Sequence, residues 1–169
     1  MKRLPSFNHF GARLFLTAVF LLALVAGITS PAAAASQSAF GAVYTLTNAA
    51  SGNEVLVYNR SSDGSLAFQG SYPTDGLGSG AGLGSQSALT LSHNNHWLFA
   101  VNAGSNEISS FAVTESGLEL VDVVDSGGTL PVSLTSYKDW LYVLNAGGSG
   151  NISGFAVGQD GSLSALAGS

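Results

Sequence analysis

One short phrase recurs along this chain and constrains its fold more than any other feature. The segment WLFAVNAG at positions 97–104 returns as WLYVLNAG at positions 140–147, which lie 43 residues later. A looser copy, VYTLTNA, occupies positions 43–49. Repeats of about 40 to 50 residues built from short strands are typical of a β-propeller, in which each repeat forms one blade.

Each copy continues with the same landmarks in the same register. An aromatic residue is followed six positions later by a glycine, and a leucine comes shortly after it: Tyr58, Gly64 and Leu66; Phe111, Gly117 and Leu118; Phe155, Gly161 and Leu163. The glycines lie in hairpin signals, where a positive φ costs little. A β-sandwich is the alternative, but sandwiches lack a fixed long period.

The apolar patterns predict individual strands. Residues 97–101 and 140–144 are continuous apolar runs, which suit inner strands covered on both faces. Residues 108–113 fit a strand further out, and residues 118–124 fit a half-exposed strand. We therefore predict an all-β fold of four-stranded antiparallel blades, with about three blade repeats near 40–96, 97–139 and 140–169.

The N-terminal 35 residues read as a secretory signal peptide. Lys2, Arg3 and Arg13 precede an uncharged apolar run at 14–28, and small residues then lead to a cleavage site after Ala35. The rival interpretation is a membrane anchor, but the run is shorter than the roughly 20 residues of a spanning helix. We expect an exported protein (periplasmic, cell-envelope or secreted) with no membrane span after cleavage.

The remaining domain, residues 36–169, holds two full repeats and most of a third. Propellers close with about four to eight blades, and an open arc would expose strand edges and apolar faces. We therefore expect the front part of a longer protein, monomeric when its ring is complete, or a chain that pairs with another molecule. A stable three-blade domain is the alternative.

Charge and composition limit the classes of partner and the kinds of site that this chain can have. All ten acidic residues lie after position 35, where Arg60 and Lys138 are the only strong bases. Such an acidic balance argues against nucleic acid, because phosphate binding needs a basic surface. The chain has no cysteine, which removes disulfides, thiol nucleophiles and thiolate metal sites. We predict no cofactor.

Three segments resemble known propeller families. Tyr142-Val143-Leu144-Asn145 is similar to the Tyr-Val-x-Asn repeat of surface-layer-type propellers, and residues 92–99 resemble the Ser-Pro-Asp-Gly-x-x-Leu-Tyr hairpin of lactonase-type seven-bladed propellers. The glycine-rich stretch 76–86 is similar to exported bacterial members. The resemblance covers residues 40–169 and implies seven blades in the complete protein. It also implies activity on a lactone, as in 6-phosphogluconolactonases, or carboxymuconate-cyclase-like activity.

The chain departs from that family at one place that matters for chemistry. Cytosolic members carry Gly-Pro-Arg-His where this chain has Ser85-Gln86-Ser87-Ala88, so the groups that could bind an anion and move a proton are absent there. Two functions stay open. One is an exported enzyme acting on a lactone or related cyclic ester. The other is a non-catalytic extracytoplasmic propeller that binds a ligand or protein at one face.

Candidate site residues are few. The end of the glycine-rich stretch could form a backbone cradle for a small lactone or carbohydrate-derived ligand, with Gly82, Gly84, Ser85, Gln86 and Ser87 as candidate ligand-binding residues. No P-loop is predicted there, because the Gly-Lys-Ser/Thr ending is missing. His93 and His96 read as exposed turn residues and not as metal ligands, and no metal site is predicted. Catalytic residues are not identified.

Overall fold

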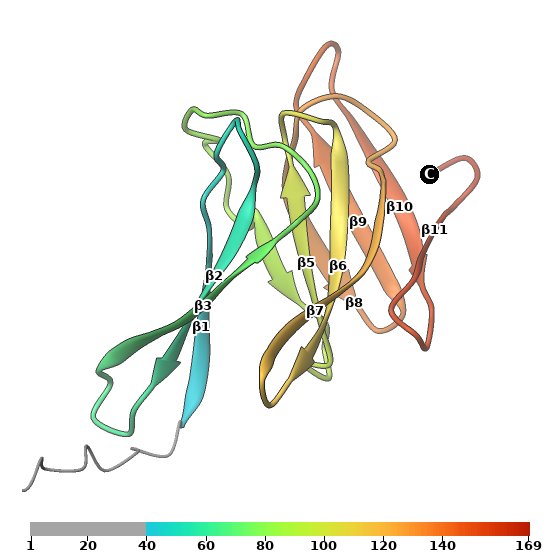
Figure 1. Ribbon diagram of the computed structural model, residues 1–169. Coiled ribbons are helices and arrows are strands. Elements are labelled where there is room, and N and C mark those ends of the chain that lie inside the picture. Colours follow the sequence, from blue (N-terminus) through green and yellow to red (C-terminus); the bar gives the residue numbers. More distant parts are fainter. Residues whose placement is uncertain (1–39) are drawn as a thin grey trace, which may run out of the picture. The chain divides into compact units, whose positions relative to one another are not determined.

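Three antiparallel sheets follow one another along the chain in the computed structural model, which describes residues 40–169 (Figure 1). The first sheet contains β1 (Gly41–Leu46), β2 (Glu54–Arg60) and β3 (Leu66–Pro73). The second contains β4 (Leu89–Leu91), β5 (Trp97–Asn102), β6 (Glu107–Thr114) and β7 (Gly117–Asp125). The third contains β8 (Pro131–Tyr137), β9 (Trp140–Asn145), β10 (Asn151–Val157) and β11 (Leu163–Ala165).

In every sheet, strands that are consecutive in the chain lie next to each other, and the described part of the chain contains no helix. The predicted fold class, a partial propeller of antiparallel blades, is confirmed. The predicted signal peptide at 1–35 lies outside the described residues. No helix within residues 40–169 has the length and apolarity to cross a membrane.

The sheets begin one strand earlier than the sequence repeat. The repeat is counted from Trp97 and Trp140, whereas the second and third sheets begin at Leu89 and Pro131. The reason is a hairpin: β4 turns at residues 92–96 and pairs with β5, and β8 turns at Lys138 and Asp139 to pair with β9. Each four-stranded sheet therefore starts with the strand that precedes the recurring phrase.

Cross-strand pairing shows which residues are equivalent in the three sheets. Val43 pairs with Tyr58, Leu98 with Phe111, and Leu141 with Phe155. In this register Thr47 takes the place of Asn102, and Asn48 lies one residue beyond it with a left-handed φ of 51°. The looser first copy thus differs from the clear copies by a one-residue slip. The slip matters because successive side chains of a strand point to opposite faces of the sheet.

Two apolar clusters join the three sheets. One packs Val55 and Val57 of β2 against Leu98, Ala100 and Phe111 of the second sheet. The other sets the opposite face of the second sheet against the third, and its buried members are Phe99, Val101, Ile108, Leu134, Leu141, Val143, Phe155 and Leu163. The second sheet is therefore covered on both faces, which explains why β5 is apolar at almost every position.

The third sheet is covered on one face only. In β9, Leu141 and Val143 are buried, whereas Trp140, Tyr142 and Leu144 are 42%, 40% and 45% exposed. The prediction of an inner strand covered on both faces is confirmed for β5, whereas within residues 40–169 β9 is covered on one face. The physical reason is that no described element packs on the second face of β9.

The hairpin glycines have the predicted conformation and a second role. Gly64, Gly117 and Gly161 have φ values of 86°, 135° and 81°. A Cβ on Gly161 would lie 2.6 Å from the ring of Trp97 in the second sheet, and one on Gly117 would collide with the Tyr72 ring of the first sheet. All three turns therefore favour glycine for its φ, and Gly117 and Gly161 are also required because an aromatic ring of the preceding sheet packs against the backbone.

Candidate functional site

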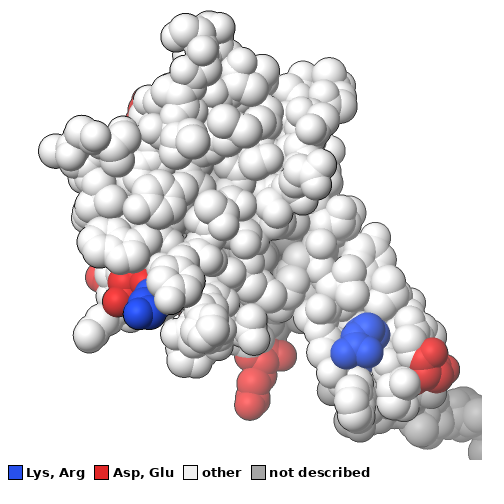
Figure 2. Space-filling model, turned by 180° about the vertical axis from the view of Figure 1, so that it is seen from behind, with Lys and Arg blue, Asp and Glu red and all other residues white. Residues whose placement is uncertain are grey.

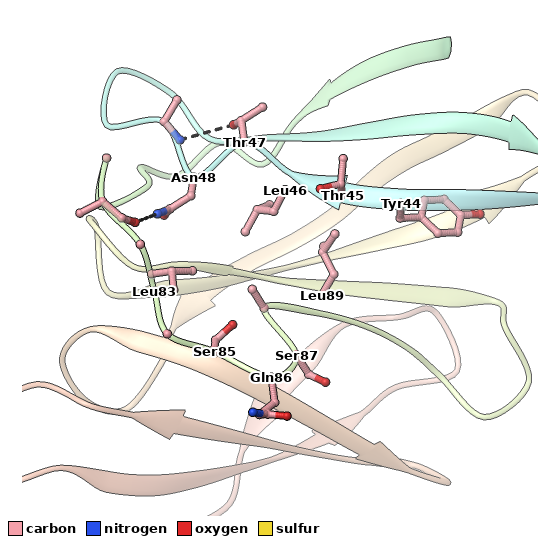
Figure 3. A pocket seen from close by; sticks show the side chains of 16 residues that line it. Tyr44, Thr45, Leu46, Thr47, Asn48, Leu83, Ser85, Gln86, Ser87 and Leu89 are labelled. Carbon is pink, nitrogen blue, oxygen red and sulfur yellow. Dashed lines mark hydrogen bonds between the residues drawn. The ribbon is translucent and has the colours of Figure 1, made fainter. Parts of the chain in front are cut away.

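An open cavity of about 830 Å³ lies between β1 and the segment that leads into β4. One wall is formed by Tyr44–Ala49 and the other by Gly80–Leu89. The side chains of Leu46 and Leu89 lie between the two walls, and Ser85, Gln86 and Ser87 follow one another along the second wall (Figure 3). The lining is a mixture of aliphatic side chains, hydroxyls, amides and backbone.

All five predicted ligand-binding residues lie in the wall of this cavity: Gly82, Gly84, Ser85, Gln86 and Ser87. A Cβ added to Gly82 or Gly84 would meet no atom within 4 Å, so the backbone at both positions is accessible. Gly84 has a left-handed φ of 61°, which turns the chain toward β4. The backbone carbonyl of Ser87 is already used, because it accepts the Leu134 N–H at 2.8 Å.

The earlier glycines of the same stretch have a packing role instead. A Cβ on Gly76 would overlap the Asn102 side chain, and one on Gly78 would overlap the Asn48 backbone. Asn48 fixes the loop: its side-chain amide donates to the Ser79 hydroxyl at 2.8 Å and to the Ala81 carbonyl at 2.6 Å, and its Oδ1 accepts the Ser79 N–H at 2.8 Å. The stretch is thus a hydrogen-bonded loop that closes one end of the cavity, and only its second half is open to a ligand.

The first sheet contributes the wall that sequence reasoning missed. By register, β1 is equivalent to β5 and β9, which are the second strands of their sheets, so residues 40–169 supply the first sheet with no strand equivalent to β4 or β8. Alternate backbone groups of β1 point away from β2, and within the described chain they pair with no other strand. In the sequence, the first copy VYTLTNA at positions 43–49 marked the place of this strand.

The cavity is electrically neutral in its described lining. Tyr44 is the one titratable residue among the residues that form its walls. Burial of the Tyr44 ring, followed by the nearby Tyr72 phenol, raises the pKa of Tyr44 above its ordinary value of 10.0. The phenol therefore stays protonated at neutral pH and can donate a hydrogen bond. Such a lining suits an uncharged ligand that carries several oxygens.

A second cavity of about 680 Å³ lies at the β4–β5 and β8–β9 turns, and Lys138, Asp139 and Gln159 help to line it. His93 and His96 are exposed in the first of these turns, as predicted. The turn is shaped by Asn94, whose Oδ1 accepts the His96 N–H at 3.1 Å. No group of three His, Asp or Glu side chains in residues 40–169 is arranged to hold a metal ion.

The recurring asparagines are structural. Asn102 is fully buried, and its Oδ1 accepts hydrogen bonds from the Asn53 amide at 2.9 Å and the Thr74 hydroxyl at 2.7 Å. Asn102 thereby holds the end of β5 to the first sheet. The equivalent Asn145 donates to the Ser126 carbonyl, but its buried Oδ1 has no hydrogen-bond partner among the described residues.

Comparisons with known proteins agree with this architecture. The family model described as "Lactonase, 7-bladed beta-propeller" matches residues 42–168. Among curated proteins no match was found.

Similar solved structures include a protein from Lactobacillus plantarum (24% identity, TM-score 0.57, 67% of this chain and 34% of that one). They also include a periplasmic gluconolactonase from Pseudomonas aeruginosa, which is 25% identical with a TM-score of 0.54. That match covers 67% of this chain and 32% of the gluconolactonase. A third is a putative 6-phosphogluconolactonase from Bacteroides fragilis, which is 24% identical with a TM-score of 0.54. That match covers 73% of this chain and 34% of the other. The present chain spans about a third of the length of each of these proteins.

Proposed function

Because this chain belongs to the lactonase family of seven-bladed β-propellers, we propose that it acts on an uncharged lactone or related cyclic ester. In such a reaction water adds to the ring carbonyl, the ring C–O bond breaks, and a hydroxy acid is released. The observation that supports this proposal is the neutral cavity between β1 and residues 80–89. A similar solved structure is a periplasmic gluconolactonase, whose name indicates an uncharged sugar lactone.

The lining favours an uncharged lactone over a phosphorylated one. A phosphate group calls for Arg, Lys or a cluster of backbone N–H groups. The described walls contain neither Arg nor Lys, which leaves only the backbone N–H groups of the glycine-rich wall to meet a phosphate. They do contain the Gln86 amide, the Ser85 and Ser87 hydroxyls, and the protonated Tyr44 phenol, which match the hydroxyl and carbonyl oxygens of a sugar lactone.

The test compares gluconolactone with its 6-phosphorylated form, using the full chain and following acid release. We expect turnover of gluconolactone in preference to the phosphorylated ester. Gln86→Ala should weaken gluconolactone binding roughly 2- to 10-fold, the effect of losing one neutral hydrogen bond. Gln159→Ala, which removes an exposed glutamine at the other cavity, is the matched control and should change nothing. Equal use of the two lactones would contradict the proposal.

A non-catalytic propeller that binds a ligand at this face is the second candidate. It is favoured by the polar side chains in the cavity walls, because Ser85, Gln86 and Ser87 can form hydrogen bonds to a bound ligand. Saturable gluconolactone binding, measured by calorimetry, without acid release would support this candidate and reject the enzymatic one. Absence of both binding and turnover would reject the two together.

Export is part of the same proposal. It is supported by the basic start, apolar run and small residues of positions 1–35. N-terminal sequencing of the protein collected outside the cytoplasm should begin at Ser36. A product that keeps Met1 or stays in the cytoplasm would contradict this part and leave the lactone assay unaffected.

A further inference from the structure

We propose that the cavity at the β4–β5 and β8–β9 turns binds a small organic anion, a carboxylate attached to an apolar or ring-shaped body. The proposal rests on the basic side chains and the indole ring that these turns bring together. It is independent of the proposed function, because this cavity shares no residue with the one between β1 and residues 80–89.

The second and third sheets form this cavity together. All of its lining residues belong to these two sheets or to the turns that join their strands, and each sheet has four strands. The first cavity meets β4 at Leu89, where the strand begins, whereas this one meets the chain at Ser92, just after the strand ends. The two cavities therefore lie at opposite ends of β4. The Ser136 hydroxyl of β8 donates to the Leu91 carbonyl of β4 at 2.8 Å, which holds the two turns next to each other.

Basic side chains are scarce in this domain, and most of them meet in this cavity. Residues 40–169 contain ten Asp and Glu residues but only four basic ones, which are Arg60, His93, His96 and Lys138. On the face seen in Figure 2, Lys and Arg form small patches in a surface that is mostly uncharged. Both histidines and Lys138 line the cavity, and they come from two different sheets. A local concentration of basic groups in an acidic domain favours an anion.

The contacts that shape the two turns leave these basic groups available to a ligand. In the β4–β5 turn, Asn94 Oδ1 accepts the Ser92 hydroxyl at 2.7 Å and the His96 backbone N–H at 3.1 Å, so neither imidazole takes part. In the β8–β9 turn, the Lys138 ammonium lies 5.3 Å from the centroid of the Tyr137 ring. This cation–π contact favours one position of the ammonium, whose N–H groups can still donate hydrogen bonds.

Trp97 supplies an apolar wall in a fixed position. Its half-buried side chain packs against the cluster between the second and third sheets, and a Cβ on Gly161 would lie 2.6 Å from its ring. An indole held in this way can pack against a flat or ring-shaped group. The cavity volume of about 680 Å³ lies in the range of small-molecule sites.

Asp139 limits the charge of the ligand. Its carboxylate belongs to the same lining, and no arginine does. Phosphate groups are typically bound by arginine forks or by several cations, and a dianion is repelled by a carboxylate more strongly than a monoanion is. One ammonium, two imidazoles and one carboxylate therefore suit a single carboxylate better than a phosphate.

The test titrates the full chain with benzoate and follows the indole N–H signal of Trp97 by nuclear magnetic resonance. Trp140→Phe leaves Trp97 as the only tryptophan and so assigns the signal. We expect a saturable shift with benzoate and roughly 10-fold weaker binding of benzamide, which has the same ring but no charge. Inorganic phosphate should also bind more weakly than benzoate.

Two substitutions in the cavity should change the Kd for benzoate in opposite directions. Lys138→Gln should weaken binding roughly 3- to 10-fold, whereas Asp139→Asn should strengthen it, because it removes the opposing carboxylate. Arg60→Gln makes the same change in net charge at β2, outside the cavity, and is the matched control that should leave the Kd unchanged. Circular dichroism checks that each variant is folded, and His96→Gln replaces Lys138→Gln if that variant is not.

Four results would overturn the proposal. The first is the absence of a saturable shift with benzoate. The second is binding of benzamide or of inorganic phosphate that equals or exceeds that of benzoate. The third is a loss in Arg60→Gln as large as in Lys138→Gln, which would mean that only the net charge matters. The fourth is tighter binding in Lys138→Gln together with weaker binding in Asp139→Asn, because such a cavity prefers a cation. The lactone assay is unaffected by each of these results.

Discussion

At several positions of this chain, contacts with the neighbouring sheet determine which amino acid is required. Asn102 is an asparagine because its buried side chain must accept hydrogen bonds from Asn53 and Thr74 and also donate to the Ser109 hydroxyl at 2.7 Å. Gly161 is a glycine because its turn needs a positive φ and because the Trp97 ring lies against it. The amino acid at these positions therefore depends both on the place in the repeat and on contacts with the neighbouring sheet.

The two repeated asparagines should differ in their contribution to stability. Asn102→Ala leaves one buried N–H of the Asn53 amide without an acceptor and also removes the hydrogen bonds to Thr74 and Ser109, so we expect it to lower the free energy of unfolding by about 3 kcal/mol. Asn145→Ala removes an oxygen that accepts no described hydrogen bond, so its cost should be smaller. Chemical denaturation of both variants tests this order, with Asn59→Ala in an exposed position of β2 as control. Equal losses at positions 102 and 145 would contradict the account.

The hairpin glycines offer a second comparison. Gly64 and Gly161 lie in matching Asp-Gly-Ser turns with similar φ, but a Cβ on Gly64 would meet nothing within 4 Å. Alanine at either position has the cost of a left-handed backbone, about 1 kcal/mol. Gly161→Ala should cost about 1 to 3 kcal/mol more, because it also displaces Trp97. Thermal or urea unfolding gives the difference, and a similar loss in both variants would exclude the ring contact.

The protonation of Tyr44 can be followed directly. Because the pKa of its phenol is raised, the stability that depends on the neutral form is complete below about pH 10 and is lost as pH rises through the ordinary and then the raised pKa. Absorbance of tyrosinate between pH 9 and 12 should show that Tyr44→Phe removes a component with a midpoint above 10. Loss of a component at or below pH 10 would place the Tyr44 ring in solvent.

At the scale of the strand, equivalent elements differ because their surroundings differ. The strands β5 and β9 have nearly the same sequence, yet β5 lies between two sheets and β9 is covered on one face. Hydrophobic periodicity predicts that both are strands, but it cannot tell how many faces are covered. Coverage depends on the presence of a neighbour, which a single repeat does not encode.

Large-to-small substitutions should reveal this difference in coverage. Phe99→Ala creates a cavity in the cluster between the second and third sheets, and we expect a loss of about 3 to 5 kcal/mol. Tyr142→Ala at the equivalent position of β9 should cost well under half as much. The free energies of unfolding of the two variants, measured by chemical denaturation, give the comparison. Similar losses would mean that β9 is covered on both faces.

At the scale of the whole molecule, the sequence predicts the fold better than the site. Phe111, Gly117 and Leu118 recur in register, so the order of strands and turns follows from the repeat alone. The candidate residues 82–87 were found because a long glycine-rich loop interrupts that repeat. The opposite wall of the cavity was not predicted, since it depends on which strands residues 40–169 supply to the first sheet and on the one-residue slip that places Asn48 beyond the position of Asn102.

The central claim is that residues 40–169 form three consecutive blades of a lactonase-family propeller, with the second blade between the other two. Methyl and aromatic nuclear Overhauser effects measure this most directly. The account predicts contacts of the Phe99 ring with Leu141 and Val143, and separately of Leu98 with Val57, so that neighbouring residues of β5 report on different blades. If Phe99 and Leu98 instead contact the same set of side chains, or neither contacts those named, the arrangement of blades is wrong.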